Sequence, residues 1–205
     1  MTSIRRFRPG DEPALAEICV RTADAGQDAT GLFRDDMLWA DNFVLPYVAR
    51  HPEFAFVVET DDGRVAGYIV ATPDTDAFYR WFAESWWPSV RDRYPLEGAG
   101  VRERDIIAYG ATRAPGQEWH APEYPAHLHI DLLPELQGQG FGRRLIDTLV
   151  AALEEHGVAG VHLAASADNA GAVAFYPRVG FAELPSEPGS RAFGRRLSPK
   201  GPFPA

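Results

Sequence analysis

Hydrophobic and polar residues follow two different periods along this chain, and these periods predict its helices and strands. Apolar residues spaced three and four apart predict helices, whereas short apolar runs between turn residues predict strands. The predicted strands lie at 3–7, 54–60, 65–72, 125–134, 159–166, 181–184 and 191–197. The predicted helices lie at 12–23, 35–49, 76–93, 101–111, 169–180 and, after a glycine-rich turn, within 132–157.

This order of elements predicts one α/β (α+β) domain over 1–205, with a mixed central sheet of six to seven strands flanked by helices. Two prolines lie inside the helical patterns. We expect Pro46 to kink the second helix and Pro88 to divide the third into a pair. The proline-rich tail, 198–205, is predicted to be a loose end.

The segment 73–125, which precedes the fourth predicted strand, is a helical insertion rich in aromatic residues. It holds four of the five tryptophans of the chain, among prolines, glycines and charged residues. One interpretation is an insertion that buries a small core of its own. The other is a lid or wall over a substrate pocket, because long insertions in compact domains are often functional. The pattern leaves both interpretations open.

The acidic balance of the chain argues against a general nucleic-acid binder. Its formal charge is −9, whereas neutralising phosphates requires a surplus of lysine and arginine. Cys19 is the only cysteine, so neither an intramolecular disulfide nor a cysteine zinc cluster can form. No apolar run reaches the length that a bilayer requires, and no apolar segment follows the charged start. We therefore expect a cytoplasmic protein without a membrane partner.

The turn before the best-patterned helix contains Gly138, Gly140 and Gly142. The first amides of a helix lack intrahelical partners and its dipole is positive there, so a glycine-rich start lets an anion reach the helix end. Arg143 and Arg144 add side-chain charge at the same place. The alternative is a tight turn without a ligand. The absence of a following GK[ST] excludes a P-loop, and the G-x-G-x-G spacing fits the dinucleotide fingerprint poorly.

Two motifs resemble those of the GNAT superfamily of N-acetyltransferases. Gln137, Gly140 and Gly142 match its Q/R-x-x-G-x-G/A signature, which precedes the helix that holds the coenzyme A pyrophosphate. The stretch "NAGAVAFYPRVGF" resembles its later motif, N-x-x-A-x-x-F-Y-x-x-x-G-F, and the resemblance covers most of the chain. Within the superfamily, "HLHIDLLPEL" and "SWWPSVRDRY" look similar to bacterial acetyltransferases related to the C-terminal domain of O-GlcNAcase. The coenzyme loop is complete in this sequence.

The resemblance implies an acetyl-CoA-dependent N-acetyltransferase, with acetyl-CoA as co-substrate, no metal, and a small-molecule or peptide amine as acceptor. It also implies a gap between the strand that ends near Leu133 and the next strand, where the thioester enters. Tyr176 matches the acid that protonates the departing thiolate. The residues implied in coenzyme binding are Leu132, Leu133, Gln137, Gly138, Gln139, Gly140, Phe141, Gly142, Arg143, Asn169, Phe175 and Tyr176.

The base for amine acetylation is expected on the strand before the glycine turn. Residues two apart share one face of a strand, so His127, His129 and Asp131 lie on the same side. Asp131 is set among apolar neighbours, and burial raises the pKa of a carboxyl group. We rank Asp131 first, as the base or as the group that orients the acceptor, His129 second and His127 third. The alternative is a structural Asp–His pair that braces the strand.

Two other functions are kept as alternatives. One is a non-catalytic module with the same fold that binds acetyl-CoA or a partner. The other is a metal-dependent hydrolase, because H-x-H-x-D matches the start of the metal-binding element of metallo-β-lactamase-like enzymes. Leu132 stands where the next histidine of that element belongs, which argues against a metal. The sequence identifies neither the acceptor nor the oligomeric state, monomer or homodimer.

Overall fold

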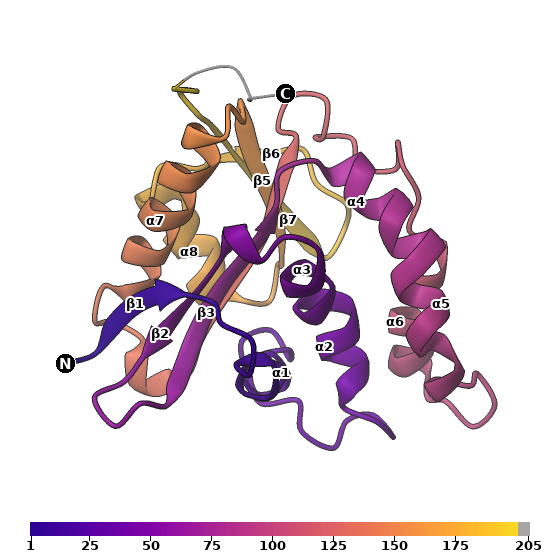
Figure 1. The fold of residues 1–205 in the computed structure, drawn as a ribbon. Helices are drawn as coiled ribbons and strands as arrows, with labels where there is room; N and C mark the ends of the chain where they lie inside the picture. Colours follow the sequence, from indigo (N-terminus) through magenta and orange to yellow (C-terminus); the bar gives the residue numbers. More distant parts are fainter. Residues whose placement is uncertain (201–205) are drawn as a thin grey trace.

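A seven-stranded mixed sheet forms the centre of the molecule (Figure 1). The computed structural model describes residues 1–200. In space the strands follow the order β1-β2-β3-β4-β5-β7-β6, and every neighbouring pair is antiparallel except β4 and β5. The strands are β1 Ser3–Arg6, β2 Ala55–Glu59, β3 Val65–Thr72, β4 Ala126–Leu132, β5 Gly160–Ser166, β6 Ala182–Leu184 and β7 Ser190–Arg196. The predicted mixed sheet is confirmed at the upper end of its expected size.

Helices cover both faces of this sheet. Figure 1 shows α7 and α8 on one side, and the helices of the first fifty residues on the other, with α4 to α6 beyond them. The helices are α1 Glu12–Val20, α2 Met37–Phe43, α3 Leu45–Arg50, α4 Thr75–Trp81, α5 Trp87–Val90, α6 Val101–Thr112, α7 Phe141–Glu155 and α8 Ala170–Arg178. Each predicted helix therefore has a counterpart in the structure.

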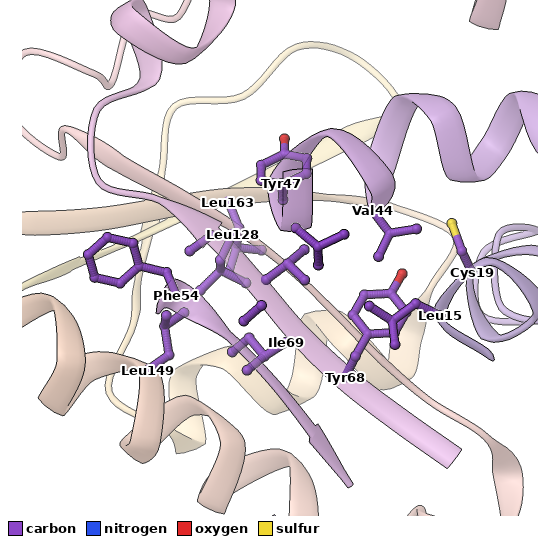
Figure 2. Close-up of a cluster of buried hydrophobic side chains, with 14 of the residues drawn as sticks. Leu15, Cys19, Val44, Tyr47, Phe54, Tyr68, Ile69, Leu128, Leu149 and Leu163 are labelled. Atoms are coloured by element: carbon purple, nitrogen blue, oxygen red, sulfur yellow. The ribbon is translucent and has the colours of Figure 1, made fainter. Parts of the chain in front are cut away.

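The core lies on both sides of β3, because successive side chains of a strand point to opposite faces. Tyr68 faces α1, where Leu15 and Cys19 are buried, and Ile69 faces α7, where Leu149 is buried (Figure 2). Apolar residues of α7 recur at three- and four-residue spacing, which turns one continuous stripe toward the sheet. Replacing a fully buried leucine such as Leu149 by alanine costs about 2–5 kcal/mol of stability in comparable cores.

Neither predicted proline effect is found as expected. The second helical segment breaks at Val44 (φ −138°), two residues before Pro46, which lies in the first turn of α3. That turn tolerates proline because its amides lack intrahelical partners in any case. The break expected at Pro88 is wrong. The chain passes through a π-helical turn, Phe82–Trp86, and continues as α5, so the wider turn absorbs the missing proline amide.

The insertion 73–125 packs into the main core instead of forming a separate one. Phe78 is fully buried and stacks on Tyr47 of α3, with 4.5 Å between the ring centroids. The carboxylate of Asp41 on α2, only 2 % exposed, accepts hydrogen bonds from Arg93 and Tyr94. These hydrogen bonds connect the residues that follow α5 to α2, one of the helices that cover the sheet.

The described part of the predicted loose tail is bonded to the end of α7. The amide of Lys200 donates to the carbonyl of Glu154 (3.0 Å), and the amide of Ser198 donates to the side chain of the same residue (3.1 Å). The expectation of a loose end is wrong for these residues, because α7 supplies acceptors to them. The rest of that segment, 201–205, lies outside the described residues.

The sheet opens between its two parallel strands. Along the described strands, β4 and β5 pair through Ala126 with Val161 and through His127 with His162. Beyond His127 the two strands separate, although β4 keeps its pairing with β3 as far as Leu132. The gap implied by the resemblance is therefore present, next to the glycine-rich turn.

Candidate active site

The turn between β4 and α7 exposes the amino end of a long helix. Gly138 (φ +73°) and Gly140 (φ +83°) adopt the left-handed conformation that favours glycine, and Gly140 is the residue that caps α7. Arg144 donates its amide to the carbonyl of Gly140 (3.2 Å), which closes the first turn of the helix. The amides before Arg144 precede that bond, so they point out of the helix end toward any anion placed there.

Gly142 makes a close packing contact possible between α7 and α8. A β-carbon at this position would lie 3.1 Å from Cζ of Phe175 and 3.5 Å from Cδ1 of Leu132. Leu132 itself lies over Gly67 of β3, where a β-carbon would come 2.3 Å from its Cδ2. The two glycines thus let β4, α7 and α8 meet tightly at the sheet opening.

A cavity of about 760 Å³ extends from this turn to the sheet opening. The α1–α2 connection forms its other wall, and the side chain of Asn169 lies next to Gly26 of that connection. Asn169 also caps α8, because its Oδ1 accepts the amide of Ala172 (3.0 Å). The predicted coenzyme residues that line this cavity are Leu132, Gln137, Gly138, Gly140, Gly142, Arg143, Asn169, Phe175 and Tyr176.

The other predicted coenzyme residues, Leu133, Gln139 and Phe141, do not line this cavity. Leu133 is buried and donates its amide to Ala66 (3.0 Å), and Phe141 is also buried. The side-chain amide of Gln139 turns back to the carbonyl of Glu135. The prediction that Arg144 adds positive charge at the glycine-rich turn is wrong. Arg144 lines a different surface hollow, together with Ile4 and Thr148, because its position on α7 directs it away from the turn.

A second cavity, of about 380 Å³, meets the first at the gap between β4 and β5. Both cavities are lined by Asp131 and Tyr176, and by Thr22 from the end of α1. The second cavity continues between aromatic and aliphatic walls formed by residues that include Trp39, Phe43, Leu128, His129 and Leu163. Residues 73–125 line neither cavity, and Tyr109 of the insertion stacks on Phe43 from behind (5.4 Å between centroids).

Asp131 is bonded to the neighbouring strand and faces the junction of the two cavities. Tyr68 lies opposite it in the β3–β4 register, and the Tyr68 hydroxyl donates a hydrogen bond to its Oδ2. Burial raises the pKa of Asp131 above the ordinary value, and the hydrogen bonds from Tyr68 and Thr22 oppose that rise. A carboxylate with a raised pKa is a stronger proton acceptor, which is the property expected of a base.

The two histidines lie on the same face of β4 as Asp131 but have different surroundings. His127 is buried, and its ring nitrogens contact the hydroxyls of Tyr47 (2.6 Å) and Thr75 (2.9 Å). His129 lines the second cavity, and its Nε2 lies 3.0 Å from the same Tyr47 hydroxyl. Burial, reinforced by Arg113, lowers the pKa of His129 to about 3, so its imidazole is neutral at physiological pH.

Tyr176 lies at the junction of the two cavities and lines both of them. Its ring packs against Phe193 of β7 (5.2 Å) and Phe181 (5.8 Å), which fixes its orientation. Burial raises the pKa of Tyr176, and the negative charge of Asp131 adds to that rise. The phenol is therefore protonated at physiological pH and is able to donate its proton.

Sequence reasoning missed Tyr68, Tyr47 and Arg113. Tyr68 carries a signal, since it is the one aromatic residue with a polar tip in an otherwise aliphatic predicted strand. Arg113 carries none, because it follows a helix that reads as an ordinary part of the insertion. Arg113 is 3 % exposed, and its guanidinium lies 4.3 Å from the ring centre of Tyr109 and 4.4 Å from that of Phe82.

The hydrolase alternative finds no support in the arrangement of these side chains. Within residues 1–200, no three histidine, cysteine, aspartate or glutamate side chains come together in a group that could hold a metal ion. His127 and His129 contact Tyr47 instead, and Asp131 is hydrogen-bonded to Tyr68.

Residues 1–200 contain no helix of the length and apolar character that crossing a bilayer requires.

Comparisons with known proteins find similar sequences and folds over most of the chain. The model of the Acetyltransferase (GNAT) family matches residues 21–181. A crystal structure of SsHAT is 40% identical, with a TM-score of 0.89 over 95% of this chain and 98% of that one. A GNAT superfamily phosphinothricin acetyltransferase from Sinorhizobium meliloti, solved in complex with AcCoA, has a similar fold (TM-score 0.56, 16% identity, 96% of this chain and 88% of that one).

A more distant likeness links the chain to a much longer protein. The Protein O-GlcNAcase of Rattus norvegicus is 21% identical over 186 residues, which cover 89% of this chain. The chain spans 20% of the length of that relative, so the comparison concerns a part of it.

Proposed function

The chain belongs to the acetyltransferase (GNAT) family, and we propose that it transfers the acetyl group of acetyl-CoA to an amine. The observation that carries this proposal is the continuity of the two cavities through the sheet opening. One cavity begins at the glycine-rich helix end, and the other ends among aromatic side chains. Asp131 and Tyr176 line both of them where they meet.

The glycine-rich turn is proposed to hold the pyrophosphate of acetyl-CoA. The free amides around Gly138 and Gly140, together with the positive end of the α7 dipole, favour a bound anion. Arg143 lines the same cavity and adds a full positive charge. The related acetyltransferase from Sinorhizobium meliloti was solved in complex with AcCoA, which supports this choice of ligand.

The sheet opening is proposed to receive the pantetheine arm and the thioester. Because β4 no longer bonds to β5 beyond His127, backbone groups on its open edge are free to contact an extended ligand. Asn169 and Phe175 of the α8 region face the same channel. A ligand held in this way would place its acetyl group beside Asp131 and Tyr176.

Asp131 and Tyr176 are proposed as the catalytic pair. The amine nitrogen forms a bond to the thioester carbonyl carbon, and the carbon–sulfur bond breaks. Asp131 accepts the proton that the amine loses, and its raised pKa suits this task. Tyr176 gives its proton to the departing thiolate. The products are an amide and free coenzyme A. Asp131 has gained one proton and Tyr176 has lost one.

Release of free thiol with a panel of small amines and short peptides tests this proposal. We expect acetyl-CoA-dependent thiol release with at least one amine, and a loss of about 100-fold or more in kcat for Asp131→Asn and for Tyr176→Phe. The affinity for acetyl-CoA should change little in either variant. If both variants keep the wild-type rate, the chain is a binding module and the catalytic pair is wrong.

A further inference from the structure

A chain of hydrogen bonds runs from a backbone carbonyl to the wall of the second cavity. The Thr75 hydroxyl lies 2.8 Å from the carbonyl oxygen of Pro125 and 2.9 Å from Nδ1 of His127. Nε2 of His127 lies 2.6 Å from the hydroxyl of Tyr47, and that hydroxyl lies 3.0 Å from Nε2 of His129. This series of hydrogen bonds thus joins the insertion, β4 and α3.

The carbonyl at one end sets the direction of every bond in this chain. A carbonyl oxygen can only accept, so the Thr75 hydroxyl donates its single proton to Pro125. The same hydroxyl must then accept from Nδ1–H of His127. In the opposite direction, two oxygen atoms would face each other at 2.8 Å with no hydrogen between them. That arrangement is repulsive, so the first direction is favoured.

The donor and acceptor roles fixed at Thr75 also fix the hydrogen bonds of Tyr47 and His129. Burial lowers the pKa of His127 well below its ordinary value, so the ring is neutral and carries one proton, on Nδ1. Its Nε2 accepts the hydroxyl proton of Tyr47, and the oxygen of Tyr47 accepts from Nε2–H of His129. His129 is also neutral, so its Nδ1 has no proton. This nitrogen has no hydrogen-bond partner among residues 1–200.

We propose that the unprotonated Nδ1 of His129 accepts a hydrogen bond from the acceptor amine and so orients it in the second cavity. The inference rests on the proposed function and assigns His129 as a positioning residue, since Asp131 takes the proton. Walls such as Trp39 and Phe43 hold the apolar part of the acceptor, but they offer no directed contact for its N–H group. Tyr47, His127 and Thr75 contribute by holding His129 in the required tautomer.

The first test is the tautomer of His129 in the free, full-length protein. Nitrogen NMR distinguishes a protonated from an unprotonated ring nitrogen, and we expect Nδ1 of His129 to be unprotonated and Nε2 to carry the proton. A proton on Nδ1 overturns the proposal. This measurement needs no turnover, so its outcome is independent of whether the chain is an acetyltransferase.

The second test removes the Thr75 hydroxyl, which begins the series of hydrogen bonds that leads to His129. Thr75→Val deletes the hydroxyl that points to Pro125, and we expect a mixture of His129 tautomers and an increase of about tenfold in KM for the amine, with unchanged affinity for acetyl-CoA. Thr72→Val is the matched control, because Thr72 is a buried threonine of β3 whose hydroxyl contacts the carbonyl of Asp74 instead. Equal KM values for the two variants would overturn the proposal.

Discussion

Tyr68 and Asp131 face each other across the β3–β4 pair, and the tyrosine hydroxyl donates a hydrogen bond to the carboxylate. The contact holds the carboxylate at the point where the two cavities meet. It also moderates the effect of burial, because a hydrogen bond to the charged form of a carboxyl group lowers its pKa. The neighbouring strand therefore sets both the position and the proton affinity of the proposed base.

Replacing Tyr68 by phenylalanine should raise the pKa of Asp131 further, because the carboxylate loses a donor while its burial remains. Activity requires the unprotonated carboxylate, so it is lost as the pH falls through this pKa. The acidic limb of the pH profile of kcat/KM should accordingly move to higher pH in the variant.

The control for this variant is Tyr94→Phe, which removes a similar tyrosine–aspartate contact, to Asp41, outside the cavities. Both variants should lose stability, by about 1–3 kcal/mol, because each leaves a buried carboxylate with fewer donors. The pH profile should move in the Tyr68 variant alone. An unchanged acidic limb in Tyr68→Phe contradicts the assignment of Asp131 as the base.

The signature that Gly142 matches admits alanine at this position, so a larger side chain is needed to test the contact with Phe175. Gly142→Val should push Phe175 away from α7, since the new β-carbon would lie 3.1 Å from its ring and would carry two further methyl groups. We expect weaker acetyl-CoA binding and a loss of about 1–3 kcal/mol in stability from overpacking. Calorimetric titration and denaturant unfolding measure the two effects. Phe175→Leu in the same chain should restore part of the stability. If the two substitutions are additive, the predicted contact is absent.

Arg113→Met should raise the pKa of His129, because it removes the buried positive charge that disfavours the imidazolium. Burial is the larger cause of the low value and persists, so the pKa should rise above about 3 yet stay below its ordinary value. An NMR titration of the ring follows this change directly. A pKa that does not move shows that Arg113 exerts no influence on His129.

The order of elements and the glycine turn could be predicted from the sequence because their signals are local. The three- and four-residue spacing of α7 and the glycines before it are visible without knowing what they pack against. The shared face of His127, His129 and Asp131 follows from the period of a strand in the same way. These features place the candidate site at the end of β4, beside the opening between β4 and β5.

The partners of these residues could not be predicted, because they depend on contacts between distant segments. Tyr47 reaches His127 from 80 positions away, and Thr75 reaches it from 52. The π-helical turn before Pro88 is a further example, since its aromatic residues pack against elements that precede the insertion. Only the folded chain shows that His127 is a link within a hydrogen-bonded chain whereas His129 faces a cavity.

A crystal structure of the full chain with acetyl-CoA tests the central claim most directly. We predict pyrophosphate oxygens within hydrogen-bond distance of the amides between Gly138 and Arg143, and the acetyl carbonyl carbon in the β4–β5 gap beside Asp131 and Tyr176. Phosphates bound elsewhere, with the glycine-rich turn unoccupied, would contradict the account.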